Sequence, residues 1–320
     1  MRIMRAAFAS AFNDDNPLAA LTVGDRPEPE RPDSDWVTVD VRASSLNHHD
    51  LWSLRGVGLT QQQLPMILGC DAAGVDPAGN EVVVYPIVLD HDDPRGASIL
   101  SEHYQGTLAE RVAVPRGNLL PKPAELSFTD AACLPTAWLT AYRMLTTKGR
   151  VHEGESVLVQ GAGGGVATAA VVLAVALGKR VYATSRDAAK RERIAELGAT
   201  ALEPGVRLPE RVDVVIETVG AATFDHSLKS SAPGARIVVS GATAGHEPKV
   251  NLRRVFAMQL EIVGTSMGTP VELAALLQLC AEQDIRPVVD SVHGFSAVDQ
   301  AFARLHSGDV FGKVVVDHTR

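Results

Sequence analysis

A run of glycines near the middle of the chain has the composition of a phosphate-binding turn. The apolar segment 156–160 leads into Gly161, Ala162, Gly163, Gly164 and Gly165, and Val166 then opens an apolar helix that extends to residue 177. Glycines let the backbone approach a pyrophosphate closely, and a helix N-terminus offers the anion unpaired N–H groups. A strand, a glycine turn and a helix in this order are what a dinucleotide-binding fingerprint requires.

Two other interpretations of this turn compete. It could be a tight turn that only packs a helix on a strand. It could also be a P-loop, but a P-loop ends in Gly-Lys-Ser or Gly-Lys-Thr, and this chain has Val166 and Ala167 at those positions. The strands and helices that alternate on both sides of the turn favour the dinucleotide loop.

The end of the next strand bears on the choice between NAD and NADP. Strand 180–184 is followed by Ser185 and Arg186, with Lys190 one helical turn later and no acidic residue at the tip of the strand. An acid would bind the ribose hydroxyls, whereas cations would accept a 2′-phosphate. Asp187 suits the cap of the following helix better than a ribose contact. The two cations could also belong to a solvated helix face, but we favour NADPH as the cofactor.

Hydrophobic periodicity places this loop in a doubly wound parallel sheet. We expect strands at 156–160, 180–184, 212–218, 235–241 and 260–265, helices at 166–177, 187–197 and 221–231, and a helix from 129 to about 148 before the loop. Repeated strand–helix units of this kind indicate a parallel sheet. Residues 1 to about 122 instead show short strands with dense turns, typical of a small β-barrel. The chain closes with a helix at 270–283, a strand at 287–292, a helix at 296–306 and a strand at 313–317.

Composition excludes several classes of function. The 320 residues suit about two domains, and 46% apolar with 21% charged residues is typical of a soluble globular protein. The net charge of −8 argues against nucleic acids and anionic membranes as partners, and no apolar run is long enough to span a bilayer. The three cysteines, Cys70, Cys133 and Cys280, are odd in number, lie far apart and include no C-x-x-C, so neither a disulfide framework nor a cysteine-rich zinc site is indicated. We expect a cytoplasmic enzyme with a small-molecule substrate.

Several short motifs follow one another over nearly the whole chain. They are SLNHHDLW at 45–52, LGCDAAG at 68–74, GTLAE at 106–110, LPTAWLTAY at 134–142, the glycine loop, GTSMGT at 264–269 and FGKV at 311–314. In this order they resemble the medium-chain dehydrogenase/reductase superfamily, and in particular its zinc-free quinone-oxidoreductase-like branch. The resemblance implies an α/β fold with a GroES-like β-barrel catalytic domain (1–122 and 268–320), a Rossmann domain (123–267) and a cleft between them. It also implies a homodimer.

The same resemblance implies that no zinc is bound. Zinc-dependent relatives have a cysteine where this chain has Asn47, a histidine where it has Cys70, and a third ligand near Ala137. Catalytic zinc needs three protein ligands, and these three positions do not supply them. The polar residues of the segment 89–105, which include His91, Asp92, Asp93, Glu102 and His103, lack a metal-binding spacing and are interpreted as loop surface.

Further site residues are implied by matching family positions. Asn47 would be a hydrogen-bonding residue beside the nicotinamide or the substrate, with a simple turn residue as the alternative. His49 stands two residues after Asn47, where zinc-dependent relatives carry the hydroxyl of a proton relay, and a histidine there could donate a proton; a structural histidine is the alternative. Cofactor-cleft positions are Thr140, Gly241, Ala242, Thr243, Thr265, Met267 and Lys313. For Lys313, an ordinary surface lysine is the competing interpretation.

These residues together favour one reaction class. Without a Lewis acid, oxidation of an alcohol is difficult, whereas a conjugated acceptor takes up hydride at one atom and spreads charge to an oxygen that hydrogen bonds can stabilise. We therefore predict NADPH-dependent reduction of a quinone or an α,β-unsaturated carbonyl. A zinc-free alcohol or carbonyl reductase and a non-catalytic NADPH-binding protein remain as alternatives.

Overall fold

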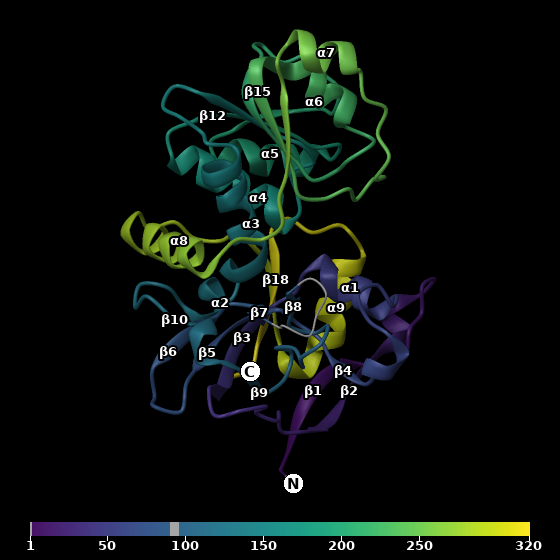
Figure 1. Ribbon diagram of the computed structural model, residues 1–320, viewed down its shortest axis with the longest axis vertical. Helices are drawn as coiled ribbons and strands as arrows, with labels where there is room; N and C mark the ends of the chain where they lie inside the picture. Colours follow the sequence, from purple (N-terminus) through teal and green to yellow (C-terminus); the bar gives the residue numbers. More distant parts are fainter. Residues whose placement is uncertain (1, 90–95) are drawn as a thin grey trace. The chain divides into compact units, whose positions relative to one another are not determined.

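The computed structural model describes residues 2–89 and 96–320 and divides into two compact units (Figure 1). One unit, which we call the β unit, contains the chain up to Thr136 and again from Leu273 to Arg320. The other, which we call the α/β unit, contains Ala137–Glu272. The expected residues His91, Asp92 and Asp93 lie outside the described part of the chain. Within the described part, no helix is both long and apolar enough to cross a membrane.

The α/β unit is built on a six-stranded sheet in which every pairing is parallel. The strand order is β13-β12-β11-β14-β15-β16, so the chain starts in the middle and winds outward in both directions. The strands are β11 (Ser156–Val159), β12 (Arg180–Thr184), β13 (Thr200–Leu202), β14 (Val212–Glu217), β15 (Ser231–Val239) and β16 (Glu261–Gly264). This is the doubly wound arrangement that the sequence predicts. Only the short edge strand β13 was absent from that prediction.

Helices connect these strands, and local sequence explains their limits. They are α4 (Gly165–Ala176), α5 (Ala188–Glu196), α6 (Phe224–Ser230) and α7 (Leu252–Ala257). Helix α4 is apolar and buries most of its length, and it ends before Gly178, whose positive φ an L-residue would adopt only with strain. Asp187 caps α5 by accepting hydrogen bonds from the amides of Ala189 and Lys190, as the sequence predicts.

The β unit combines three sheets. Its largest sheet has the order β10-β6-β5-β3-β18-β17, with β9 paired to β3, and a second sheet has the order β2-β1-β4. The strands are β1 (Ile3–Ala9), β2 (Leu21–Pro27), β3 (Trp36–Ser45), β4 (Met66–Ile67), β5 (Asp71–Val75), β6 (Glu81–Val84), β9 (Arg111–Pro115), β10 (Leu119–Pro121), β17 (Val289–Gly294) and β18 (Lys313–Asp317), and β7 (Ile87–Leu89) pairs with β8 (Ala97–Ile99) as the third sheet.

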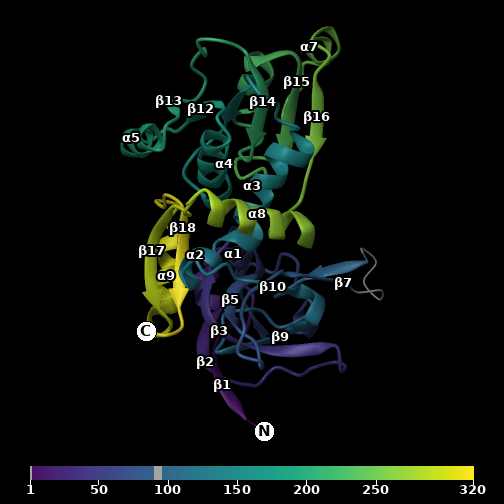
Figure 2. The same ribbon diagram turned by 90° about the vertical axis from the view of Figure 1, so that its left-hand side faces the viewer.

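Helix α9 (Val298–His306) covers β17 and β18 (Figure 2). Its buried face, Val298, Ala301, Phe302 and Leu305, joins a core that also contains Leu46, Leu51 and Leu54. The last strand of the chain, β18, therefore lies inside the unit that the first 136 residues build.

The expected single helix over 129–148 is wrong in detail. The structure has α2 (Phe128–Ala131) and α3 (Leu139–Arg143), with π-helical turns at Leu134–Trp138 and Met144–Lys148. Pro135 explains the first interruption, because proline lacks an N–H and cannot continue the α-helical hydrogen-bond pattern.

Candidate functional site

The carboxyl edge of the parallel sheet collects the predicted cofactor-binding residues of the α/β unit. The glycine loop follows β11, Ser185 and Arg186 follow β12, Gly241 to Thr243 follow β15, and Thr265 to Met267 follow β16. Because all these strands are parallel, their carboxyl ends lie at one edge of the sheet. The topological switch point falls at β11, between β12 and β14, where open α/β sheets bind their ligands.

The glycine loop has a geometry that only glycine allows. Gly161 has φ +67°, and a Cβ at this position would lie 2.4 Å from Val219 Cγ2. The amide of Ala162 donates to the carbonyl of Thr184 at 2.7 Å, which ties the loop to the neighbouring strand. Gly164 is the N-cap of α4 and has no side chain to satisfy the first amides of the helix, so these amides remain as donors for an anion.

The loop after β12 is held by a residue that the sequence did not single out. Arg191, one turn into α5, donates from Nη1 to the carbonyls of Ser185 and Arg186 at 2.9 and 3.0 Å. Ser185 is buried, while Arg186 is exposed. Arg191 therefore fixes the backbone that presents Arg186. Its side chain carries the same charge as the cations around it, which is why the sequence pattern alone did not distinguish it.

The remaining predicted cofactor residues of this unit are placed as follows. Thr243 Oγ1 donates to the carbonyl of Thr218 at 3.3 Å, beside the end of β14. Thr140 is buried in α3, and Met267 is buried after β16 with a positive φ. Thr265 Oγ1 is buried and has no hydrogen-bond partner among the described residues. These positions do not test the predicted roles in cofactor binding, which remain predictions.

A second polar centre lies in the β unit, where three neighbouring strands bring distant residues together. Strand β3 pairs antiparallel with both β5 and β18, and Ser45 lies opposite Asp71 on one side and Val315 on the other. Asn47 follows β3 by two residues, and Lys313 precedes Val315 by two. The antiparallel register therefore brings Lys313 to Asn47, and it brings Asp71 next to both.

Lys313 is the centre of this arrangement. Its side chain is 2% exposed, and its Nζ lies 2.8 Å from the carbonyl of Leu46, 2.7 Å from Asn47 Oδ1 and 3.1 Å from Asp71 Oδ2. The interpretation of Lys313 as an ordinary surface lysine is therefore wrong. A buried charge persists in a folded protein when it is paired and hydrogen-bonded, and here both conditions are met.

The two oxygens of the Asp71 carboxylate differ in the number of their hydrogen-bond partners. Asp71 is 0% exposed, and its Oδ2 lies within hydrogen-bonding distance of Ser45 Oγ (2.8 Å), Asn47 Nδ2 (2.9 Å) and Lys313 Nζ. Its Oδ1 is buried and has no donor among the described residues. Asp71 and Ser45 are not among the predicted site residues, because their contacts depend on pairing between strands that are distant in the sequence.

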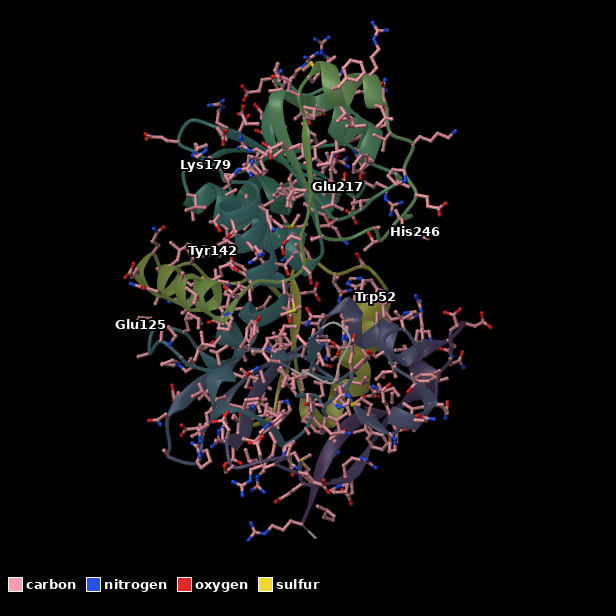
Figure 3. The ribbon with its side chains drawn as sticks, in the orientation of Figure 1. Trp52, Glu125, Tyr142, Lys179, Glu217 and His246 are labelled. Carbon is pink, nitrogen blue, oxygen red and sulfur yellow. The ribbon has the colours of Figure 1, made fainter. Side chains whose placement is uncertain are left out.

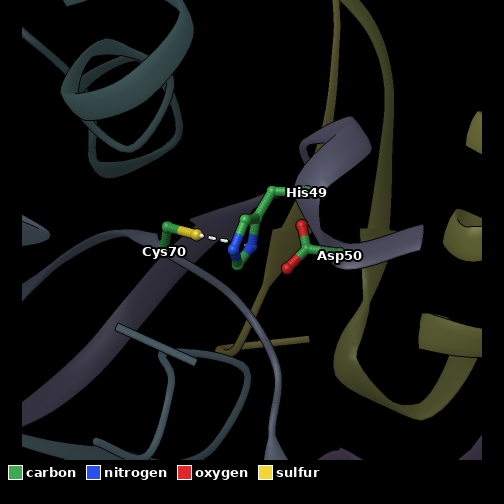
Figure 4. A group of neighbouring side chains, drawn as sticks. All are labelled: His49, Asp50 and Cys70. Atoms are coloured by element: carbon green, nitrogen blue, oxygen red, sulfur yellow. Dashed lines mark hydrogen bonds between the residues drawn. The ribbon is translucent and has the colours of Figure 1, made fainter. Parts of the chain in front are cut away.

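His49 belongs to a second cluster on α1 (His48–Leu54), shown in Figure 4. Its Nδ1 lies 3.3 Å from Cys70 Sγ, and its Nε2 lies 3.2 Å from Glu102 Oε1. Asp50 does not contact the ring through a hydrogen bond. Its two oxygens accept the amides of Asn47 and Gly69, each at 2.8 Å, which fixes the start of α1 against the segment that carries Cys70.

The surroundings of His49 favour its protonated form. Burial alone would lower the pKa of His49, but Cys70, Glu102 and Asp50 together outweigh burial and raise this pKa above the ordinary value. Burial is also the main effect on Cys70, and it raises the pKa of the thiol. The charge effect of Cys70 on His49 requires an ionised thiol, whereas the carboxylates of Glu102 and Asp50 favour the imidazolium in either state of Cys70. A protonated His49 is a proton donor.

The residues at the zinc-ligand positions do not fit a catalytic zinc. Both polar atoms of the Asn47 amide are engaged by Lys313 and Asp71, and Ala137 offers no ligand atom. The ammonium of Lys313 lies 2.7 Å from Asn47 Oδ1, so a divalent cation at Asn47 would meet a like charge. His49, Asp50 and Cys70 bring three possible ligand atoms within 4.8 Å, but both Asp50 oxygens already accept backbone hydrogen bonds.

Two family models match the chain. The model described as the alcohol dehydrogenase GroES-like domain matches residues 33–124, and the model described as zinc-binding dehydrogenase matches residues 194–316. The first match lies in the β unit, and the second spans most of the α/β unit and the return of the chain to the β unit.

Solved structures and curated proteins agree with these matches. A crystal structure of an NAD-dependent alcohol dehydrogenase is 34% identical, has a TM-score of 0.88 and covers 98% of this chain and 99% of its own. The cobalt- and zinc-bound thermostable alcohol dehydrogenase of Pyrobaculum aerophilum is 30% identical, with a TM-score of 0.87 and coverage of 99% and 100%. Acryloyl-coenzyme A reductase of Sulfurisphaera tokodaii is 27% identical over 91% of this chain and 94% of its own.

The fold, the two family models and these relatives identify the class of protein as a two-domain dehydrogenase/reductase. The chain belongs to the medium-chain dehydrogenase/reductase superfamily, with a GroES-like domain and a Rossmann-like parallel sheet. The predicted fold class is thereby confirmed. Members of this superfamily are oxidoreductases that use nicotinamide cofactors, and oxidoreductase activity is supported for this chain as well.

Proposed function

We propose that this protein is an NADPH-dependent reductase that transfers a hydride to a conjugated carbonyl, either a quinone or an α,β-unsaturated carbonyl compound, without a catalytic metal. The observation that carries the proposal is the buried group of Lys313, Asn47 and Asp71. By the resemblance, Asn47 stands where zinc-dependent relatives have a cysteine ligand, and this group provides a positive charge and a hydrogen-bonding amide there. Such a group can stabilise an oxygen that gains negative charge, but it does not ionise an alcohol as zinc does.

Binding of the dinucleotide is assigned to the carboxyl edge of the α/β sheet. The amides at the start of α4 would bind the pyrophosphate, and Gly161 would permit its close approach. Ser185, Arg186 and Lys190 would receive the 2′-phosphate, with Arg191 holding their loop in place. The reduced nicotinamide, when bound, supplies the hydride. The proposed preference for NADPH over NADH rests on the cations Arg186 and Lys190.

Two residues of the β unit would act on the acceptor. Asn47 would donate a hydrogen bond from Nδ2 to the carbonyl oxygen, which becomes negatively charged as hydride arrives at the conjugated carbon. His49, whose pKa is raised, would donate the proton that completes the reduction. Glu102, 3.2 Å from Nε2, orients the ring for this role. The named activity of the acryloyl-coenzyme A reductase relative, reduction of an unsaturated thioester, supports a conjugated acceptor.

A second candidate is a zinc-free alcohol or carbonyl reductase. It is favoured by the 34% identity to a structure described as an NAD-dependent alcohol dehydrogenase. The two candidates differ in the acceptor, so turnover of unsaturated compounds and of simple ketones or alcohols separates them.

The first experiment is an acceptor panel. Oxidation of NADPH is followed by loss of the dihydronicotinamide absorbance with quinones, enones and enoyl thioesters, with NADH in parallel, and NADP⁺ is tested with simple alcohols. Turnover of conjugated acceptors with preference for NADPH is the expected result. Turnover with NADH alone would overturn the assignment of Ser185, Arg186 and Lys190. Binding of NADPH with no turnover would favour a non-catalytic role.

The role of His49 makes a prediction about pH. Because its pKa is raised, His49 holds its proton through neutral pH, and kcat should stay constant there and fall only in the alkaline range. The substitution His49→Gln should lower kcat by about 100-fold and remove the alkaline decline. His306→Gln, at an exposed histidine at the end of α9, is the control. An unchanged pH profile in His49→Gln would exclude His49 as the donor.

Two further assignments accompany this proposal. We propose a homodimer in which β16, the edge strand of the parallel sheet, lies at the interface. Leu252 and Phe256 of α7, 70% and 72% exposed, follow the loop after β15 and precede this strand. Light scattering at micromolar concentration tests this. We also propose a cytoplasmic location, because the cysteines Cys70, Cys133 and Cys280 are free and buried.

A further inference from the structure

The Asn47 amide has a defined orientation in this structure. A lysine ammonium can only donate hydrogen bonds and a carboxylate can only accept them. The amide atom that faces Lys313 Nζ at 2.7 Å must therefore be the oxygen, and the atom that faces Asp71 Oδ2 at 2.9 Å must be the nitrogen. A flipped amide would face a donor with a donor and an acceptor with an acceptor, so the two charged neighbours exclude it.

In this fixed orientation, one hydrogen of the Asn47 amide has no hydrogen-bond acceptor among the described residues. The amide nitrogen of Asn47 carries two hydrogens, and only one is directed to Asp71. The other has no acceptor among the residues that the structure describes, and Asn47 is half-buried, not sealed from solvent. The three hydrogens of Lys313, in contrast, are all matched by oxygens, at Leu46, Asn47 and Asp71. Lys313 therefore has no hydrogen left for a ligand.

We propose that Lys313 is a positioning residue that acts through Asn47 and does not itself contact the cofactor. The ammonium withdraws electrons from the amide oxygen, which makes the Nδ2 hydrogens stronger donors, and the Asp71 carboxylate holds one of these hydrogens and thereby fixes the direction of the other. The remaining Nδ2 hydrogen becomes a stronger donor with a fixed direction. Its ligand is a carbonyl oxygen, that of the conjugated acceptor. The choice of a carbonyl oxygen as the ligand rests on the proposed function. The fixed orientation of the Asn47 amide does not depend on that function.

The first test measures the amide directly. The chain has six asparagines, so labelling with [¹⁵N]asparagine gives six side-chain NH₂ pairs, and the pair that Asn47→Asp removes belongs to Asn47. In Lys313→Met, hydrogen exchange of the Asn47 pair should accelerate by about tenfold or more, since the amide is free to turn. Lys122→Met is the matched control, because Lys122 is another lysine of the same unit whose buried side chain pairs with a carboxylate, Glu81 at 2.9 Å.

The second test measures coupling in catalysis. Asn47→Ala should lower kcat for a conjugated acceptor by about 100-fold, and Lys313→Met by about 10-fold, with KM for NADPH unchanged in both. If Lys313 acts through Asn47, adding Lys313→Met to Asn47→Ala should cause no further loss. A lysine that binds the cofactor would instead raise KM for NADPH in either background.

Folding of the variants is controlled separately. Lys313→Met leaves the Asp71 carboxylate buried without its cation, so the pair Asp71→Asn with Lys313→Met, which removes both charges, is measured beside it. This pair should also release the Asn47 amide. Unchanged amide exchange in both variants would overturn the proposal, whether or not the protein reduces any acceptor. Faster exchange of the Asn47 amide in both variants, together with a wild type that reduces no acceptor, would support the fixed orientation of the amide and contradict the proposed function.

Discussion

Glu217 in the α/β unit and Asp71 in the β unit are both completely buried carboxylates, and they are satisfied in different ways. Glu217, at the end of β14 and inside the α/β unit (Figure 3), accepts hydrogen bonds on both oxygens. Its Oε1 receives the amides of Val219 and Gly220 and the hydroxyl of Thr223, and its Oε2 receives Ser227 Oγ at 2.6 Å. Asp71 in the β unit uses one oxygen for all its partners and leaves the other without a donor.

The donors also differ in charge. Glu217 is held by amides and hydroxyls of its own segment, Val219 to Ser227, so it shapes the turn that follows β14. Asp71 is held by Ser45 of β3, by Asn47 two residues after β3 and by Lys313 of β18, and the last of these groups is an ammonium. A carboxylate whose oxygens are both hydrogen-bonded serves the structure of its own segment. A charged group that keeps one free acceptor and one free amide donor is suited to bind a ligand.

Two partly buried histidines show a similar difference. In the α/β unit, His226 accepts from Gln160 Nε2 at its Nδ1 and donates from Nε2 to the carbonyl of Val206, so both ring nitrogens are used. In the β unit, His318 contacts Ser44 Oγ through Nε2, but its buried Nδ1 has no partner among the described residues. Asp71 and His318 of the β unit each keep one buried polar atom without a partner among the described residues, whereas Glu217 and His226 of the α/β unit do not.

The largest effect on stability is expected from a substitution of Asp71. Asp71→Leu should destabilise the protein by about 3–5 kcal/mol, because it leaves the Lys313 ammonium buried without a counter-charge. Asp71→Leu combined with Lys313→Met should recover most of this loss, since a packed apolar pair replaces a buried ion pair at little cost. Urea unfolding followed by tryptophan fluorescence measures both. If the single variant were as stable as the wild type, Lys313 would not depend on Asp71.

A smaller effect is expected at Glu217. Glu217→Gln keeps the size of the side chain but replaces one acceptor with an NH₂ group that cannot accept from Ser227 or from the amides. The unfolding free energy should fall by about 1–3 kcal/mol. In an active preparation, KM for the dinucleotide should rise, because the turn after β14 lies at the cofactor edge, while the pH profile of kcat should stay unchanged. An altered pH profile would contradict a purely structural role for this network.

The smallest effect concerns pH and His318. Burial lowers the pKa of His318 to about 4, and Asp317 opposes this only in part. Between the ordinary histidine pKa and about 4, the unfolded chain binds a proton that the folded protein does not, so stability falls as the pH is lowered. His318 should account for about 1 kcal/mol of loss between pH 7 and 5.5. His318→Gln should remove this part of the acid sensitivity, and His226→Gln should not.

Much of the α/β unit could be predicted from the sequence. The glycine loop, the strands around it and the Asp187 cap are local patterns, since hydrophobic periodicity, glycine conformation and capping act over a few residues. They sufficed for the doubly wound sheet, whereas the positions at 241–243 and 265–267 were predicted from the family resemblance. The Pro135 region shows the limit of the same signals, because an apolar pattern continues through a segment whose backbone hydrogen bonds change register.

Only the tertiary structure decided what Lys313 does. Its sequence neighbours, Gly312 and Val314, give no indication that it is buried, and the residues that bind it are 242 and 266 positions away. The pairing of β18 with β3, and of β3 with β5, brings one ammonium, one amide and one carboxylate together. Burial of a charge is a property of the surroundings that the fold creates, so the motif resemblance could suggest Asn47 and His49 as candidates but could not identify the groups that contact them.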